Sequence, residues 1–530
     1  MFFGGHSAQM RDSSKTNSYT LKFDLSSQFT NEHLFKLGVE FAYFDLNLNY
    51  GKVSPAFDDI NYVKQQWNPY RLSAYIQDKI EMLGFIANVG LRMDLSNPNT
   101  EWVDVDPFDK SYFSGDYDKS INYPTKKADI DIALSPRIGI SHPITENSKL
   151  YFNYGHFKEL PAYQEIFRIG RGGSGALSNW GDPNLVEAKT IAYELGYDHA
   201  LFDLYLLQIQ GFYRDISNVQ AYTNYTSERK GIGYFKVTND NYQDVRGVEL
   251  TLKKSAGDWI RGFVTFTYQV TTNGAFGSGR VNDNPADQRI INQTTQNLYQ
   301  QKPVPQPRSR ASLTFLTPHE YGPNLGGIQF FSDWSLTILG DWRAGQYINY
   351  NPNQVREISN IVQNVQTSDY FNIDLQINKT FDFNFLTVML FVDARNLLNT
   401  KRLSGASFYD ARDQQFYFES LHLPKSDAYN NIPGDDRVGD YRKEGVEFQP
   451  IIYDYTTIDQ VSEPQTRPFY YETATGRYMQ YVDGNWQEVN NNKLNQVLED
   501  KAYIDMPNNT SFNFLNPRQI FFGINLSFKL

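Results

Sequence analysis

The sequence predicts an all-β protein in which antiparallel strands form a transmembrane β-barrel with long extracellular loops. Three observations favour this fold class: segments in which apolar and polar residues alternate, connections that are alternately short and long, and many aromatic residues in a polar chain. The 530 residues include 37 Tyr and 38 Phe, yet the mean hydropathy is −0.54. Short alternating strands joined by long polar loops explain this combination, because only one face of each strand meets lipid.

The last segment, 518–530, shows the alternation most clearly. One face carries Phe522, Ile524, Leu526, Phe528 and Leu530, and the other carries Phe521, Gly523, Asn525, Ser527 and Lys529. This period of two predicts a strand with one apolar and one mostly polar face. A closing barrel strand has this form, because its outer face meets lipid. The last core strand of a β-sandwich can look similar, so the decision depends on whether the pattern recurs.

The pattern recurs and predicts about fifteen strands. We expect them at 19–30, 33–49, 70–81, 85–95, 134–143, 149–158, 189–200, 203–213, 245–254, 259–270, 309–316, 331–342, 370–380, 386–396 and 518–530. Short connections alternate with long ones, as do the periplasmic turns and extracellular loops of outer-membrane barrels. A β-sandwich has no reason to keep this rhythm. The connection 317–329 is the exception, because it is long for a periplasmic turn.

Two long stretches are predicted to contain no strand series. Residues 215–241 are expected to form a loop. Residues 397–517 are expected to form one long extracellular insertion before the final strand, within a partial barrel that covers 1–530. The positions predicted to face the lumen are polar or charged: Arg92, Glu194, Gln208, Gln210, Glu249, Lys253, Asp374, Asp393 and Arg395.

Composition excludes several classes of protein. The net charge of −11 argues against nucleic-acid binding, which requires clustered Lys and Arg. No apolar run approaches the roughly 18 residues that a transmembrane helix needs. The chain has no Cys. No signal peptide is visible at the N-terminus, so we expect a fragment whose natural start lies upstream.

Few residues suggest bound ligands or chemistry, and no enzymatic activity is expected. The glycine-rich stretch 170–175 lacks the Lys and Ser or Thr of a phosphate-binding loop, so we interpret it as a flexible loop. The seven His show no metal-ligand spacing. Asp435, Asp436 and Asp440 could hold Ca²⁺ in a flexible loop or simply form a turn. No other cofactor is expected.

Four aromatic residues in the insertion are candidates for ligand binding. They are Tyr409, Phe416, Tyr417 and Phe418. Their rings could stack on sugars or on an aromatic chelate. The alternative is that they pack a small core within the insertion itself. The sequence favours this second interpretation, because aromatic side chains supply a large buried area.

Four stretches carry a resemblance to a known family. They are LSPRIGISHPITENSKLYFNYG at 134–155, continuing to Leu160 and Pro161, DPNLVEAKTIAYELG at 182–196, RGVEL at 246–250 and ARNLLN at 394–399. In their order and spacing they resemble the C-terminal barrel of a TonB-dependent outer-membrane receptor of the Bacteroidetes type. The resemblance extends over most of the chain from about residue 19, except the insertion.

This resemblance implies a barrel of 22 strands, an N-terminal plug and a TonB complex that acts through the plug. The chain shows neither the plug nor about seven of the strands. Gly523, Leu526 and Phe528 resemble the terminal signal read by the outer-membrane assembly machinery. Outer-membrane lipid and a surface lipoprotein are the further partners implied.

The resemblance therefore predicts part of a receptor in the cell outer membrane of a Gram-negative bacterium, for uptake of a ferric chelate or an oligosaccharide. One alternative is a passive channel or a structural barrel that closes with fewer strands. Another alternative is a secreted, soluble β-sandwich adhesin that binds glycans. The ligand itself is not predicted, because irregular loops would determine it.

Overall fold

The structure is a computed structural model that describes residues 10–52, 62–82, 84–172, 174–294, 302–326, 328–348, 365–383, 385–400, 417–423, 436–437, 446–500 and 517–528. It is nearly all-β, with 21 strands in one hydrogen-bonded sheet. The chain divides into two units. The first comprises 1–199, 209–248 and 270–303, and the second comprises 200–208, 249–269 and 304–530.

All fifteen predicted strands are present, which confirms the predicted fold class. They are β2 (Lys15–Gln28), β3 (His33–Lys52), β5 (Tyr70–Met82), β6 (Phe85–Asn97), β9 (Asp131–Thr145), β10 (Ser148–Glu159), β13 (Ala188–Leu201), β14 (Tyr205–Ser227), β15 (Ile232–Lys254), β16 (Ile260–Ala275), β19 (Arg308–Leu316), β22 (Trp334–Arg343), β25 (Tyr370–Asp382), β26 (Leu386–Arg395) and β31 (Gln519–Phe528).

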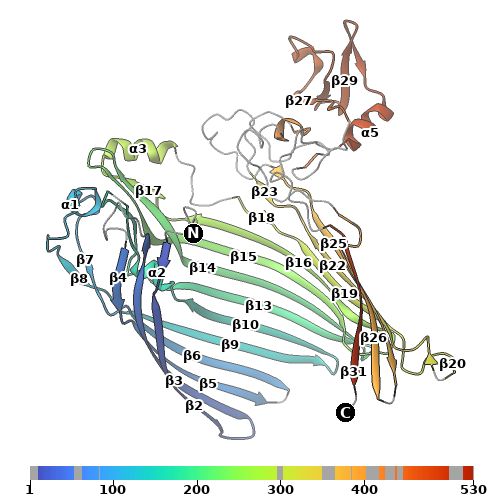
Figure 1. Ribbon diagram of the computed structural model, residues 1–530, viewed down its shortest axis with the longest axis horizontal. Coiled ribbons are helices and arrows are strands. Elements are labelled where there is room, and N and C mark those ends of the chain that lie inside the picture. Colours follow the sequence, from blue (N-terminus) through green and yellow to red (C-terminus); the bar gives the residue numbers. More distant parts are fainter. Residues whose placement is uncertain are drawn as a thin grey trace, which may run out of the picture. The chain divides into compact units, whose positions relative to one another are not determined.

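In the first unit, β2, β3, β5, β6, β9, β10 and β13 pair in this order, and every pair is antiparallel (Figure 1). The register keeps like side chains on one face, since residues paired across strands point the same way. Tyr75 lies opposite Arg92, and the next pair is Ile76 with Leu91. Ile76 and Leu91 are 48 % and 45 % exposed. The sheet therefore has an apolar outer face and a polar inner face, as the alternation predicts.

In the second unit, β16, β19, β22, β25, β26 and β31 pair in this order, again antiparallel. The final strand β31 lies along β26, and its predicted apolar face is open. Phe522, Ile524 and Phe528 are 78 %, 64 % and 68 % exposed. Such large exposed apolar surfaces are typical of a face that contacts lipid.

The connections contain short elements that the sequence did not predict. In the first unit these are β1 (Met10–Asp12), β4 (Tyr62–Trp67), β7 (Glu101–Val103), α1 (Lys110–Phe113), β8 (Thr125–Lys127), α2 (Tyr163–Phe167), β11 (Ile169–Arg171), β12 (Leu177–Trp180), β17 (Arg280–Asn282) and α3 (Pro285–Thr294). In the second unit they are β18 (Val304–Pro305), β20 (Asn324–Leu325), β21 (Ile328–Gln329), β23 (Tyr347–Ile348) and β24 (Val365–Gln366). Within the described ranges, no helix has the length and apolar character needed to cross a membrane.

The prediction of a loop at 215–241 is wrong. β14 and β15 continue through this stretch, each for 23 residues, and meet in a turn at 228–231. Gly231 closes the turn with φ +66°, a conformation that suits glycine, and its N–H donates to the Glu228 carbonyl at 3.2 Å. The stretch is rich in Asn, Thr and Tyr and has no continuous apolar face. The period-two signal is therefore missing although the backbone is extended.

The prediction that 397–517 has no strand series is also wrong. Residues 446–500 contain β27 (Ile451–Tyr455), β28 (Phe469–Glu472), β29 (Arg477–Val482), β30 (Asn485–Glu488), the 3₁₀ turn η2 (Ile458–Gln460) and α5 (Asn491–Glu499). The four strands form their own sheet, and Ile451, Phe469 and Val497 contribute to its buried core. These strands are short, and Phe469, Tyr470 and Tyr471 are consecutive aromatics, so the sequence shows no alternation.

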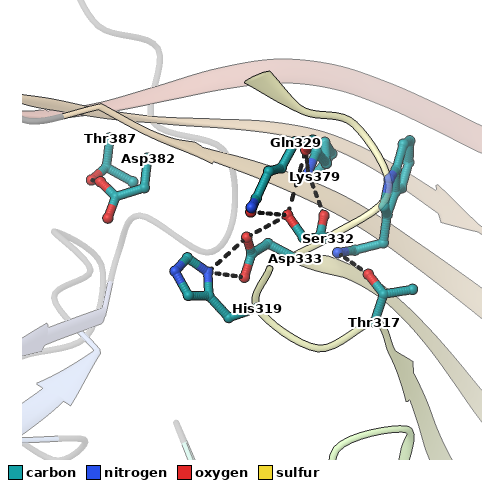
Figure 2. A network of polar contacts seen from close by, with 9 residues as sticks. Thr317, His319, Gln329, Ser332, Asp333, Lys379, Asp382 and Thr387 are labelled. Carbon is teal, nitrogen blue, oxygen red and sulfur yellow. Dashed lines mark hydrogen bonds and ion pairs between the residues drawn. The ribbon is translucent and has the colours of Figure 1, made fainter. Parts of the chain in front are cut away.

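The long connection between β19 and β22 is held by a polar network (Figure 2). The Lys379 ammonium on β25 donates to the backbone carbonyls of Gln329, at 2.8 Å, and of Ser332. Asp333 binds the His319 ring at 3.0 Å and accepts from the Ser332 hydroxyl at 2.9 Å. The unusual length of this connection thus corresponds to a structured turn that contains the β20–β21 hairpin.

On the inner face, an aromatic ring lies over a glycine of the neighbouring strand at several places. Tyr75 crosses Gly38 and donates to an Asp24 carboxylate oxygen at 2.8 Å. A Cβ on Gly38 would lie 2.3 Å from Tyr75 Cε1 and 2.5 Å from Asp24 Oδ1. The absence of a side chain at Gly38 therefore permits the Tyr75–Asp24 hydrogen bond.

We expect Gly38→Ala to destabilise the sheet by about 1–3 kcal/mol, because the added methyl group displaces Tyr75 from Asp24. Urea unfolding of the chain in detergent micelles measures the loss. Gly211→Ala is the matched control, since its Cβ would meet nothing closer than the Leu195 carbonyl at 4.0 Å. Equal stability of the two variants would contradict the role given to Gly38.

We also expect the sheet at 446–500 to loosen in acid. The pKa of Glu472 is lowered from its ordinary value of 4.5 by hydrogen bonds from the Thr475 hydroxyl and the Ile458 N–H. A carboxylate with a lowered folded-state pKa stabilises the fold above its unfolded pKa, and this contribution is lost as the pH falls through the folded pKa.

Hydrogen exchange over 451–488, corrected for the intrinsic effect of pH, measures this change between pH 6.5 and pH 3. The wild type should lose protection, and Glu472→Gln should show weaker protection at pH 6.5 and a smaller change with pH. The same pH dependence in both proteins would rule out Glu472 as the group responsible.

Candidate functional site

The long connections of the first unit gather at one end of its strands (Figure 1). Antiparallel hairpins require this, because every second connection returns to the same end. We call this region the loop assembly: β4, β7, α1, β8, α2, β11 and β12 together with residues 215–241 of β14 and β15. Short parallel strands extend the long hairpin on both sides, since β12 pairs with β15 and β17 pairs with β14.

The loop assembly has an aromatic core of its own. Its buried members are Trp102, Tyr112, Phe113, Leu177, Trp180, Ile232 and Tyr234. Phe113 stacks on Tyr234 with ring centroids 4.4 Å apart and meets Trp180 edge-on at 4.9 Å. Tyr234 donates to the Pro107 carbonyl at 3.0 Å, and burial raises the pKa of its hydroxyl far above the usual range. The loops are therefore packed against one another around a shared aromatic core.

Arg171 fastens the glycine-rich stretch to this core. Its guanidinium carbon lies 3.4 Å from the centroid of the Tyr117 ring and 4.8 Å from that of Tyr112, which allows cation–π attraction. It also donates to the carbonyls of Tyr112 at 2.9 Å and Gly175 at 3.0 Å. Of this stretch, Gly170 and Arg171 belong to β11, which pairs antiparallel with β12, so β11 is followed by a strand and not by the helix that a phosphate-binding loop opens.

Within the loop assembly, the short helix α2 contacts both β4 and the long hairpin of β14 and β15. Phe167 is buried and stacks on Trp67 at 4.8 Å. Burial raises the pKa of Tyr163 to about 12. Glu165 accepts from the hydroxyl of Tyr222, on the long hairpin, at 2.7 Å to each carboxylate oxygen. The Leu160–Pro161 stretch noted in the sequence therefore leads into a helix that braces two loops.

The stretch 182–187 has a comparable bracing role. The buried Glu187 carboxylate accepts from the Ser96 hydroxyl at 2.6 Å, and Lys236 pairs with Asp182 at 2.9 Å. Asn184 accepts from the Asp129 N–H at 2.9 Å. Beside these residues lies a pocket of about 150 Å³, lined in part by Arg71, Asn97, Tyr163, Asn184 and Glu187.

The inner face below the loops is polar, as the sequence predicts. Arg92 binds Asp94 through its Nε at 2.9 Å to both carboxylate oxygens, and Ser73 donates to Asp94 at 2.7 Å. Glu194 pairs with Arg214 at 3.6 Å. These residues form a polar wall in which the charges of Arg92 and Glu194 are paired with neighbours on the sheet.

The predicted ligand-binding aromatics are only partly described. Tyr409 and Phe416 lie outside the described residues. Tyr417 is fully buried in a short helical turn, and Phe418 is half-buried with its ring 6.0 Å from that of Tyr417. Their binding role stays a prediction.

The predicted calcium site also stays a prediction. Two of its three residues, Asp435 and Asp440, lie outside the described residues. Asp436 is buried, and one carboxylate oxygen accepts from the His422 backbone N–H at 2.9 Å and lies 3.1 Å from His422 Nδ1. Among the residues that the structure describes, no three His, Asp or Glu are arranged to hold a metal ion.

The three residues predicted as an assembly signal lie on β31. Leu526 and Phe528 are exposed on its apolar face. Gly523 faces the other way and lies beneath the ring of Phe391, whose Cζ would be 2.3 Å from an added Cβ. The glycine is therefore required for packing, whatever part it takes in assembly.

Comparison with known proteins identifies the family. The family model described as "TonB dependent receptor-like, beta-barrel" matches residues 2–397, and the chain belongs to this family. No curated protein sequence matches the chain significantly.

Several solved structures are similar in fold. The FrpB iron transporter from Neisseria meningitidis is 14 % identical with a TM-score of 0.46, over 74 % of this chain and 53 % of that one. The hemophore receptor HasR from Serratia marcescens is 16 % identical with a TM-score of 0.45, over 74 % and 57 %. The siderophore receptor PirA from Pseudomonas aeruginosa is 15 % identical with a TM-score of 0.43, over 73 % and 55 %. The chain thus spans about half the length of these structures.

We predict that Phe113→Ala destabilises the loop assembly by about 3–5 kcal/mol, because it removes a fully buried ring between Trp180 and Tyr234. Limited proteolysis followed by mass spectrometry should show faster cleavage within 98–130 and 160–187. Phe235→Ala is the control, since that ring is 47 % exposed on the same hairpin. Unchanged cleavage in Phe113→Ala would show that the aromatic core does not hold the loops.

Proposed function

We propose that this chain provides the wall and the ligand-capturing outer loops of a TonB-dependent receptor of the Bacteroidetes type, located in the cell outer membrane. Membership of the receptor family supports this function. The single structural observation that favours capture is the loop assembly, because an aromatic core holds irregular loops in a fixed arrangement at one end of a polar-walled sheet. Preorganised loops bind a ligand without the entropic cost of ordering.

The ligand class in this proposal is a scarce, large nutrient, either a ferric chelate or an oligosaccharide. The exposed ring of Tyr222 and the amide side chains at the loops suit both, since flat apolar faces stack on sugar rings and on aromatic chelates. Energy would come from the TonB complex acting through a plug domain. Outer-membrane lipid, the assembly machinery and a surface lipoprotein are the other proposed partners. A loop-bound Ca²⁺ at Asp436 and its neighbours remains part of the proposal.

The alternative of a passive channel differs in one respect, which is the need for energy. The β-sandwich alternative does not fit a chain of this family. A passive channel would admit solute down its gradient, whereas a receptor of this family would accumulate its ligand only when TonB functions.

The test compares cells that express the gene for this chain with and without functional TonB. We expect the protein in the outer-membrane fraction, and TonB-dependent accumulation of either an iron-55 chelate or a labelled oligosaccharide. Phe113→Ala should weaken binding with an unchanged amount of protein in the membrane. Phe371→Ala should not, because this ring lies on β25, outside the loop assembly, and is 42 % exposed. Uptake that is equal without TonB would favour the passive channel, and recovery of the protein in the soluble fraction would contradict both.

A further inference from the structure

A lysine lies in the apolar outer face of the second unit, at the end where short turns join the strands. Side chains at every second position of β25 point outward, and Leu375, Ile377 and Lys379 follow one another in this row. Register places Lys379 between Trp334 of β22 and Leu390 of β26, and both of these large side chains are exposed. The row that contains the lysine is therefore the row that contacts lipid.

The connection between β19 and β22, residues 317–333, covers this lysine. The Lys379 ammonium donates to the backbone carbonyls of Gln329, at 2.8 Å, and of Ser332, and only 3 % of the lysine is exposed (Figure 2). An ammonium group on a lipid-facing strand is costly unless polar groups such as carbonyls surround it. The connection therefore folds over the outer face of the strand ends, where it shields the lysine from lipid.

Aromatic contacts hold the connection on the same face. Phe381 is the next outward-pointing residue of β25, and its ring meets that of Phe330 edge-on, with centroids 6.3 Å apart. The indole N–H of Trp334 donates to the Phe330 carbonyl at 2.7 Å. Phe330 is thus fixed by an outward-facing residue from each of two strands, β25 and β22.

Large aromatic surfaces remain exposed around the connection. Tyr321, Phe330 and Phe331 lie within it, and Tyr321 meets Trp259 edge-on at 4.9 Å. Each of these four side chains is between 47 % and 53 % exposed. Phe331 lies against Gly322, where an added Cβ would be 2.9 Å from the Phe331 Cβ, so the glycine gives this ring its place. Exposed aromatic rings at strand ends are typical of the layer in which a bilayer meets water.

The connection also carries charged groups. The His319 ring lies 3.0 Å from the Asp333 carboxylate, and the neighbouring Glu320 is exposed. These groups need water or lipid headgroups, because hydrocarbon offers them no hydrogen bonds. Aromatic rings and charges on one short segment are satisfied together in the headgroup layer, which supplies apolar and polar partners at the same depth.

We propose that residues 317–333 form a membrane-contact element whose partner is a phospholipid surface. The element lies in the headgroup layer at the short-turn end of the strands, which is the periplasmic leaflet of an outer membrane. Lipid is the partner because the exposed rings continue the lipid-facing surface of β22, β25 and β26. The proposal goes beyond the function given above, since it requires a sheet that spans a bilayer but neither a captured ligand nor TonB.

Fluorescence quenching of a bimane label on single cysteines tests this contact, with the full chain in phospholipid vesicles. Aqueous iodide should quench the label of Phe331→Cys about five-fold less than that of Ala256→Cys, which lies in the exposed short turn between β15 and β16. A lipid with its nitroxide near the headgroup should quench the Phe331→Cys label best. Ile338→Cys, on the outer face of β22, should be quenched best by a lipid with its nitroxide near the end of the acyl chain.

Lys379→Met should raise iodide quenching of the Phe331→Cys label a few-fold, because the connection loses both hydrogen bonds from the ammonium group. Lys253→Met is the matched control, since this lysine of β15 is exposed and should leave quenching unchanged. Tyr321→Cys is a second reporter if Phe331→Cys fails to fold.

Iodide access at the connection equal to that at Ala256→Cys would overturn the proposal while leaving the receptor function intact. Iodide access at Ile338→Cys as well would show that the sheet itself does not lie in the bilayer, and would contradict both.

Discussion

The antiparallel register of the long strands is the constraint on which the rest of the structure depends. Backbone N–H and C=O groups that face lipid must be paired within the sheet, so the ladder has to run unbroken across each strand. The same ladder determines which side chains share a face. Ile76 lies opposite Leu91 on the outer side and Tyr75 lies opposite Arg92 on the inner side. A slip of one residue would exchange the two faces, placing Arg92 in lipid and Leu91 in water.

The inner wall and the loops both follow from this register. Tyr75 reaches Asp24 only because Gly38 lies between them without a side chain, and the row through Gly90 and Gly155 leaves a hollow for the same reason. At the strand ends the ladder no longer imposes alternation. The loops there are stabilised by a second kind of packing, a core of aromatic rings around Phe113. The chain thus has exposed apolar side chains, aliphatic and aromatic, on the sheet and a buried aromatic core in its loops.

The sequence predicts the long strands well because period-two alternation is a direct consequence of two different solvents on the two faces. All fifteen are present, and Arg92 and Glu194 line the inner wall as expected. Prediction fails where both faces of a strand have similar surroundings. The distal hairpin of β14 and β15 is polar. In β28, the consecutive residues Phe469 and Tyr470 point to opposite faces of the strand, and both are buried. The candidate site is less predictable still, since Phe113, Trp180 and Tyr234 lie far apart in the sequence and come together only in the folded loop assembly.

The central claim is that the two faces of this sheet meet lipid and water respectively. The chain has no Cys, so a single cysteine can be introduced at each position of 89–93 on β6 and spin-labelled after reconstitution in bilayers. The account predicts that labels at 89, 91 and 93 collide mainly with oxygen dissolved in the bilayer. Labels at 90 and 92 should collide mainly with a water-soluble nickel chelate. Equal access of the chelate at all five positions, or alternation in the opposite phase, would contradict the account.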